Sequence, residues 1–466
     1  MSGSDRLFSA ARVLSALTAH DHGKNWWVAL SGGADSTALL HILCEARQSF
    51  KTKIRAVHVN HGLHPDSEHW SAWCESLCEE LGVAFRCIKI EINTQSGLGL
   101  EAQARQKRYA AAAALLEPND LLLTAHHADD QAETLLLNLM RGSGVAGLAG
   151  MPISRPLGKG NIFRPLLQFS RRDLEQYLTR KGQSWIEDAS NSDLRHDRNF
   201  IRHKVLPSLE TRWPSAREAL NQSARHCKEA KSYLNDQLTR ELRHCSPIEQ
   251  VLDLAVLRER LNMHCGTDGW RIMVRHWLLT NGAESLPRSK LAELERQLCC
   301  SKQTGHITVQ WREWVVHHYQ DSLWLQEIDS VKRCPGYVWD TDLPLELGGP
   351  LGTLTLHETL LPQNQQWNVR ARQPGDKIQS LTGGRHQSIK SILQECHFPT
   401  WLRDSVPIVT RAEEIIAVGH LVTSQGLRQK RKDSTGIINW KPRDPLLIYA
   451  HDRAHNRKVD PRETLG

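Results

Sequence analysis

The sequence predicts an α/β protein with an N-terminal parallel-sheet domain, a mainly helical second domain and a small α+β C-terminal domain. The first 150 residues alternate short apolar runs with helical patterns, which is typical of βαβ units. Residues 216–330 are mostly helical in pattern, and residues 346–440 mix short apolar runs with one helical segment. We expect domains over 1–215, 216–330 and 331–441, followed by a disordered tail at 442–466.

Length and composition support several domains and exclude a membrane protein. The chain has 466 residues, of which 40% are hydrophobic and 24% charged, as in ordinary globular proteins. The longest apolar run, 109–116, is far shorter than the ~18 residues that a membrane-spanning helix needs. The weakly apolar segment 7–19 is interrupted by charges, so we interpret it as an amphipathic helix and not a signal peptide.

Cysteine usage and net charge limit the possible cellular locations and binding partners. The eleven cysteines include no C-x-x-C pair and show no regular spacing. At this chain length such usage favours a reducing, cytoplasmic location over a disulfide framework. The formal charge of +7 permits nucleic acid binding but does not prove it.

The N-terminal region has strands of large apolar residues and helices with apolar residues at helical spacing. Because ligands of a parallel sheet bind beyond the carboxyl ends of its strands, the turns that follow these strands are where chemistry is expected. In order, the expected strands are 26–30, 54–59, 84–92 and 121–125, and the expected helices are 36–43, 66–81, 101–116 and 129–140.

Beyond residue 150 the pattern changes. Arg155-Pro156 and Arg164-Pro165 predict loops, because proline cannot donate to a sheet ladder. The later elements are a helix at 171–180, a polar turn-rich segment at 185–202, helices from 216 to 242, paired strands at 305–326, a linker at 331–345 and a helix at 387–396.

The sharpest local signal is Ser31-Gly32-Gly33-Ala34-Asp35-Ser36, between an expected strand and an expected helix. The glycines allow close approach of backbone amides to an anion, and the helix N-terminus adds positive potential. Ser31, Ser36 and Thr37 add hydroxyl donors. The loop is neither a Walker A sequence nor G-x-G-x-x-G. The alternative interpretation is a bare turn with a capped helix.

This loop resembles the signature of the PP-loop ATP pyrophosphatases, which cleave ATP to AMP and pyrophosphate while adenylating a substrate oxygen. Further segments follow in order, and together they resemble the tRNA(Ile)-lysidine synthetase family. The resemblance covers most of residues 24–215 and resumes near residue 401. These segments read A-V-H-V-N-H-G-L at 56–63, E-A-Q-A-R at 101–105, A-H-H-A-D-D-Q-A-E-T at 125–134, R-G-S-G at 141–144, R-P-L-L at 164–167, W-I-E-D at 185–188, D-R-N-F-I-R at 197–202 and W-L-R-D at 401–404.

The resemblance implies an adenine nucleotide alpha hydrolase-like fold and a two-step reaction that uses ATP and Mg²⁺. ATP adenylates the C2 carbonyl oxygen of the first anticodon cytidine of an isoleucine tRNA with anticodon CAU. The ε-amino group of free L-lysine then attacks C2 and expels AMP, which gives lysidine. The expected partners are this tRNA and lysine, with no membrane. The oligomeric state is left open, with a homodimer as one candidate.

The first step assigns the nucleotide to the loop. Ser31, Gly32, Gly33, Ala34, Asp35 and Ser36 are expected to cradle pyrophosphate. Asp35 is a candidate Mg²⁺ ligand or water holder, or else a helix cap. His58 and His61 are expected to frame adenine or pyrophosphate, or to be satisfied polar histidines.

The second step needs carboxylates for a substrate that carries two ammonium groups. His126, Asp130 and Glu133 stand at i, i+4 and i+7, which predicts one helix face. The carboxylates suit the ammonium groups of lysine. The alternatives for this face are a metal site and a solvated helix surface.

Four arginines complete the predicted site. Arg105 and Arg108 are expected to meet phosphate or the substrate carboxylate, or to lie on an ordinary surface. Arg198 and Arg202 are expected to contact the adenylate or the lysine carboxylate. The alternative for this second pair is a salt bridge to Glu187 or Asp188.

The C-terminal half is expected to bind tRNA through phosphate contacts. The candidate residues are Arg370, Arg372, Lys377, Arg385, Lys390 and Arg403. The stretch after Gly383-Gly384 is less basic than is usual in the family, which predicts a flatter salt dependence. Two rival functions remain: a PP-loop tRNA thiolase, which would need paired cysteines near the loop, and a non-catalytic RNA-binding module.

Overall fold

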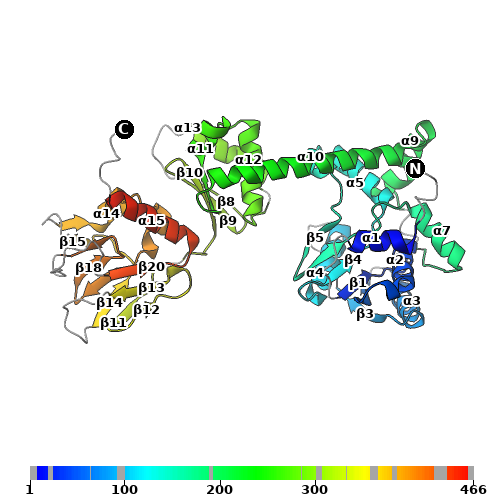
Figure 1. The fold of residues 1–466 in the computed structure, drawn as a ribbon, viewed down its shortest axis with the longest axis horizontal. Helices are drawn as coiled ribbons and strands as arrows, with labels where there is room; N and C mark the ends of the chain where they lie inside the picture. The colour runs from blue at the N-terminus through cyan, green and yellow to red at the C-terminus, as the bar shows by residue number, and fades with distance from the viewer. Residues whose placement is uncertain are drawn as a thin grey trace. The chain divides into compact units, whose positions relative to one another are not determined.

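The computed structural model describes residues 8–18, 25–62, 64–91, 100–187, 193–284, 286–300, 307–331, 333–356, 366–379, 386–424 and 438–459. The chain forms two compact units, Met1–Leu234 (unit 1) and Asn235–Gly466 (unit 2) (Figure 1). The boundary falls inside the longest helix, α10 (Ala216–Cys245), and not at the expected position near residue 215. The early turns of α10 bond to residues of the α/β domain, as described below.

Unit 1 is built on a six-stranded sheet, in the order β3-β2-β1-β4-β6-β5. All neighbours are parallel except the antiparallel pair of β5 and β6. The predicted α/β class is therefore confirmed. The strands are β1 (Asn25–Ala29), β2 (Lys53–Asn60), β3 (Ala84–Lys89), β4 (Leu121–Leu123), β5 (Ser154–Leu157) and β6 (Gly160–Phe163).

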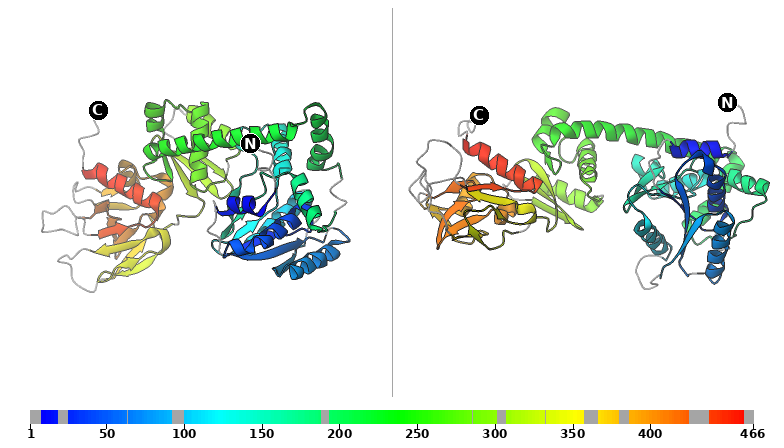
Figure 2. Two further views of the ribbon diagram at one scale, coloured as in Figure 1. Left: turned by 45° about the vertical axis from the view of Figure 1, so that its right-hand side comes forward. Right: turned by 60° about the horizontal axis from the view of Figure 1, so that its bottom comes forward.

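Helices cover both faces of this sheet, as the views of Figure 2 show. Alternate residues of β1 point to opposite faces: Trp26 and Val28 pack with α1, α2, α3 and α7, whereas Trp27 packs with α4. The helices are α1 (Ala10–Thr18), α2 (Ala34–Glu45), α3 (Ser67–Glu80), α4 (Leu100–Leu115), α5 (Ala128–Met140), α6 (Val145–Leu148), α7 (Arg171–Lys181), α8 (Asp197–Phe200) and α9 (Leu206–Arg212).

Two predictions for unit 1 need correction. Arg155-Pro156 is not a loop but part of β5, because β5 is the edge strand, where proline leaves no ladder bond unmade. The third strand ends at Lys89, and Ile92 lies outside the described residues.

After the end of α10, unit 2 forms an antiparallel sheet, in the order β7-β10-β9-β8, packed against helices. The paired strands predicted at 305–326 are three strands, and β7 was not predicted. The elements are β7 (Val251–Asp253), β8 (Ile307–Trp311), β9 (Trp314–Tyr319), β10 (Ser322–Glu327), α11 (Leu254–Leu261), α12 (Asp268–Thr280) and α13 (Arg288–Cys300).

The rest of unit 2 contains a five-stranded sheet, a three-stranded sheet and a two-stranded sheet. The segment 331–345 is not a plain linker, because β11 pairs with β14 and buries Trp339. The strands are β11 (Tyr337–Asp340), β12 (Leu345–Glu346), β13 (Thr353–Leu356), β14 (Gln366–Arg370), β15 (Lys377–Gln379), β16 (His386–Ser388), β17 (Ile408–Arg411), β18 (Glu414–Val418), β19 (Val422–Thr423) and β20 (Ile438–Lys441).

Among the described residues of unit 2, two further α-helices follow, and one of them overturns a prediction. α14 (Ile389–Glu395) was expected, but α15 (Pro445–Val459) lies in the tail that was predicted to be disordered. That prediction is wrong for residues 445–459, because Leu446, Leu447 and Ala450 are buried in the core of unit 2. Among the described residues, no helix combines the length and the apolar character needed to cross a membrane.

Candidate functional site

A cavity of about 440 Å³ lies beyond the carboxyl ends of β1, β2 and β4. β1 pairs with β2 on one side and with β4 on the other, so the strand order reverses at this point. Such a switch point is where ligands of open α/β sheets bind. The cavity is lined by ten of the predicted site residues: Ser31, Gly33, Asp35, Ser36, His58, His61, Arg105, Arg108, His126 and Asp130.

The loop between β1 and α2 is held in shape by its own hydroxyl groups. The Ser31 N–H donates to Ser36 Oγ (3.1 Å), and Ser36 Oγ donates to the Gly33 carbonyl oxygen (3.1 Å). Thr37 Oγ1 donates to the Gly32 carbonyl oxygen (3.2 Å). Gly32 has a φ of +86°, which favours glycine, and Gly32 and Ala34 are not among the lining residues. The loop is therefore preorganised before any anion binds.

Asp35 has a buried carboxylate oxygen. Asp35 Oδ1 has no hydrogen-bond partner among the described residues, whereas Oδ2 lies 3.4 Å from His127 Nε2. No group of three or more His, Cys, Asp or Glu residues in the described part of the chain could hold a metal ion. A single carboxylate fits Mg²⁺, which proteins often bind through one or two carboxylates together with substrate phosphates.

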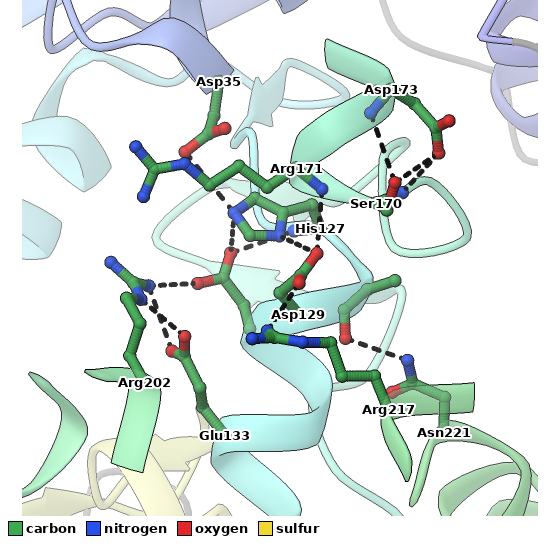
Figure 3. Close-up of polar contacts among 12 residues, drawn as sticks. Asp35, His127, Asp129, Glu133, Ser170, Arg171, Asp173, Arg202, Arg217 and Asn221 are labelled. Carbon is green, nitrogen blue, oxygen red and sulfur yellow. Dashed lines mark hydrogen bonds and ion pairs between the residues drawn. The ribbon is translucent and has the colours of Figure 1, made fainter. Parts of the chain in front are cut away.

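The predicted carboxylates and arginines bind one another. Arg198 Nε donates to Glu133 Oε2 (2.6 Å), and its Nη2 donates to Asp130 Oδ1 (2.8 Å). Arg202 Nε donates to Glu133 Oε1 (2.6 Å) (Figure 3). Arg198 and Arg202 therefore pair with Asp130 and Glu133 and not with Glu187, which was the alternative. Asp188 lies outside the described residues.

Glu133 and Asp130 share these ion pairs but differ in their access to the cavity. Glu133 is fully buried and does not line the cavity, and neither do Arg198 and Arg202. Asp130 is 8% exposed and does line it. A solvated helix face is therefore wrong for Glu133. Arg202 lies in a π-helical turn, Ile201–Val205, a feature that is frequent at functional sites.

His126 is not on the helix face with Asp130 and Glu133, because α5 begins only at Ala128. Its Nδ1 lies 2.9 Å from Thr124 Oγ1, and its ring still lines the cavity. Burial, together with nearby arginines, outweighs the Asp130 carboxylate and lowers the pKa of His126 to about 4. The ring is neutral at pH 7.

His127 is the residue that the sequence analysis missed. It is 1% exposed and caps the N-terminus of α5. Its Nε2 lies 3.4 Å from both Asp35 Oδ2 and Asp130 Oδ2, and its Nδ1 lies 3.4 Å from Asp129 Oδ2. Burial alone would lower the pKa of His127, but the three carboxylates outweigh it and raise the pKa to about 10. The available signal was a histidine two residues before a pair of aspartates at a helix start.

The remaining predicted residues lie around the cavity wall. Arg105 is exposed, and its guanidinium lies 5.4 Å from the centre of the Tyr109 ring. Arg108 is also exposed. His58 Nδ1 lies 2.9 Å from the Leu30 carbonyl oxygen, and burial lowers the pKa of His58. His58 therefore fits the alternative of a satisfied polar histidine while still lining the cavity.

The basic residues expected to contact RNA in unit 2 have different environments. Arg403 is 7% exposed and donates to the Phe398 carbonyl oxygen, so its predicted phosphate contact is wrong. Arg370 pairs with Asp376, and Arg372 pairs with Asp404. Lys377 and Lys390 are exposed, and Arg385 lies outside the described residues.

Comparisons with known proteins agree with this geometry. The PP-loop domain model matches residues 8–209. The TilS substrate binding domain model matches residues 270–324, and the TilS substrate C-terminal domain model matches residues 367–440.

Curated relatives match over most of the chain. The tRNA(Ile)-lysidine synthase of Methylococcus capsulatus is 37% identical over 85% of this chain and 91% of its own length. The tRNA(Ile)-lysidine synthase of Coxiella burnetii is 33% identical over 94% of this chain and 97% of its own length. That of Shigella flexneri is 37% identical over 86% of this chain and 93% of its own length. With the PP-loop and its cavity in place, this chain belongs to the tRNA(Ile)-lysidine synthase family of ATP-using ligases.

Proposed function

We propose that this enzyme joins L-lysine to C2 of the first anticodon cytidine of an isoleucine tRNA with anticodon CAU, with cleavage of ATP to AMP and pyrophosphate. One observation carries the proposal. Ser31, Gly33 and Ser36 of the loop line the same cavity as Asp35 and Asp130, at the switch point of the sheet.

In the adenylation step, the loop holds the phosphates of ATP. The N-terminus of α2 and the hydroxyl group of Ser31 stabilise negative charge on the departing pyrophosphate, and the preorganised loop avoids a reorganisation cost. Asp35 Oδ1 is the proposed ligand of Mg²⁺, which supplies charge neutralisation for the phosphate oxygens.

In the second step, the cavity orients lysine. Asp130 faces the cavity and attracts an ammonium group, although its charge is shared with Arg198. The neutral ring of His126 can accept a hydrogen bond from the lysine amine. Arg105 and Arg108 line the cavity and are therefore better placed for the lysine carboxylate than Arg198, which is paired with both acidic residues.

Cysteine environments argue against the thiolase alternative. Cys74 and Cys78, the thiols closest in sequence to each other in unit 1, are both buried. Burial raises the pKa of each thiol to about 12, so both are protonated at pH 7. A protonated, buried thiol is a poor sulfur carrier. The intact set of charged groups in the cavity likewise argues against a non-catalytic RNA-binding module.

We propose further that residues 216–330 and 331–441 bind the tRNA. Support comes from the exposed Lys377 and Lys390 and from the two substrate-domain matches. A cytoplasmic location and a homodimer remain predictions.

The test is incorporation of radiolabelled lysine into an isoleucine tRNA transcript with anticodon CAU, with ATP and Mg²⁺ present. The matched substrate is an elongator methionine tRNA with the same anticodon. Stable label is expected in the isoleucine transcript alone. The matched enzyme is the Asp35→Ala variant, which should lose tRNA-dependent pyrophosphate release along with label.

Two results would refute the proposal in different ways. Pyrophosphate release without label in either transcript would keep adenylation but require another nucleophile, with sulfur the first to try. Equal ATP turnover by the wild type and Asp35→Ala would indicate that the loop is not catalytic.

A further inference from the structure

His127 joins the PP-loop to the N-terminus of α5. Its Nε2 lies at 3.4 Å from a carboxylate oxygen of Asp35 on one side and of Asp130 on the other. With 1% exposure, the ring is inaccessible to substrate and does not line the cavity. Its contribution to the reaction can therefore only be through the residues that it contacts.

The two acidic residues depend on His127 unequally. Asp130 is also held by the His127 backbone N–H (2.9 Å) and by Arg198 (2.8 Å). Among the described residues, Asp35 Oδ2 forms an ion pair with His127, and Asp35 Oδ1 has no hydrogen-bond partner. Removal of the imidazole should therefore release Asp35 while leaving Asp130 in place.

The other ring nitrogen of His127, Nδ1, pairs with Asp129. Asp129 Oδ2 accepts from the Arg171 backbone N–H (2.8 Å) and lies 3.4 Å from His127 Nδ1. Asp129 Oδ1 accepts from Arg217 Nη1 (2.6 Å), and Asn221 Nδ2 donates to the Ala128 carbonyl oxygen (3.0 Å). Arg217 and Asn221 belong to the first two turns of α10 (Figure 3).

We propose that His127 is a positioning residue that fixes the carboxylate of Asp35 toward the nucleotide, and that Asp129 and Arg217 hold the imidazole in that position. This inference deepens the proposed function and rests on it. It also gives the first two turns of α10 a role in the catalytic domain, through Arg217 and Asn221.

The test compares His127→Ala, His127→Gln and Asp129→Asn in the full chain. The readouts are MgATP affinity by calorimetry, tRNA-dependent pyrophosphate release and the KM for lysine. His127→Ala should lower kcat/KM for MgATP about a hundredfold, as a misplaced catalytic group does. Its KM for lysine should be unchanged, because Asp130 keeps its other partners. His127→Gln, which retains one donor, should recover part of the loss, and Asp129→Asn should show a smaller loss of the same kind.

The matched control is His41→Gln. His41 is also a buried histidine, and it lies on α2, the helix that carries Asp35. This variant should leave MgATP affinity unchanged. Wild-type MgATP affinity in folded His127→Ala would overturn the inference, and so would equal losses in MgATP affinity and lysine KM. If the wild type releases pyrophosphate but incorporates no lysine, the proposed function fails, while the affinity comparison still decides the role of His127.

Discussion

Gly32 is a point of close contact between the PP-loop and the segment after α7. A Cβ at this position would lie 2.5 Å from Ile186 Cδ1, and the φ of +86° already disfavours other residues. The Ile186 N–H also donates to the Gly32 carbonyl oxygen (2.9 Å). Gly33 differs, because its φ is −69° and the nearest atom to a Cβ, Ser31 Oγ, would lie 3.6 Å away.

Gly32→Ala should therefore destabilise the protein by about 2–5 kcal/mol, the sum of a left-handed backbone penalty and a steric clash. Gly33→Ala, the matched variant, should change the free energy of unfolding by about 1 kcal/mol or less. Chemical denaturation of both variants measures the difference. Equal stability of the two would show that the Ile186 segment moves aside at no cost.

Site residues could be predicted from the sequence where the chemistry requires a particular residue type. The anion-binding loop with Asp35 follows from glycine geometry and from the strand–loop–helix order. The pairing of Asp130 and Glu133 with Arg198 and Arg202 was not predictable, because α5 and the segment of α8 and the following π-helical turn are brought together only by tertiary packing. His127 was missed for the same reason: its partners come from α2 and α5.

At the scale of elements, α15 shows how burial can oppose a composition-based prediction. The segment is rich in charged residues, which suggested disorder, but one side of the helix buries apolar residues in unit 2. Leu447 is fully buried, whereas its neighbour Ile448 is 39% exposed. A few well-spaced apolar residues were enough for docking.

Leu447→Ala should lower the free energy of unfolding of unit 2 by about 2–5 kcal/mol, because it leaves a cavity in the core. Ile448→Ala, the neighbouring control on the same helix, should cost under about 1 kcal/mol. Denaturant titrations that follow tryptophan fluorescence can measure both. A Leu447 variant as stable as the wild type would support the original expectation of a disordered tail.

At the scale of the whole molecule, the net charge of +7 does not say which cations are available to RNA. Arg370 and Arg372 pair with aspartates and Arg403 is buried, whereas Lys390 on α14 is exposed. Fewer available cations mean fewer counterions released on binding, and therefore a shallower salt dependence of tRNA affinity.

Lys390→Gln should reduce the slope of log K against log salt by about 1, as expected for one lost phosphate contact. Arg370→Gln should leave the slope unchanged and instead lower stability, because it removes the ion pair with Asp376. Filter binding of the tRNA over a salt series provides the slopes. Equal slopes for the wild type and Lys390→Gln would remove this lysine from the RNA interface.

By itself, the sequence determined the α/β class, the first four parallel strands but not β6, the PP-loop and the residue types of the candidate site. These follow from local periodicity and turn chemistry, which act over a few residues. Only the tertiary structure decided the strand order, the burial of Glu133, the central position of His127 and the docking of α15. Each of these depends on contacts between residues far apart in the chain, where charge pairing and burial outweigh local preference.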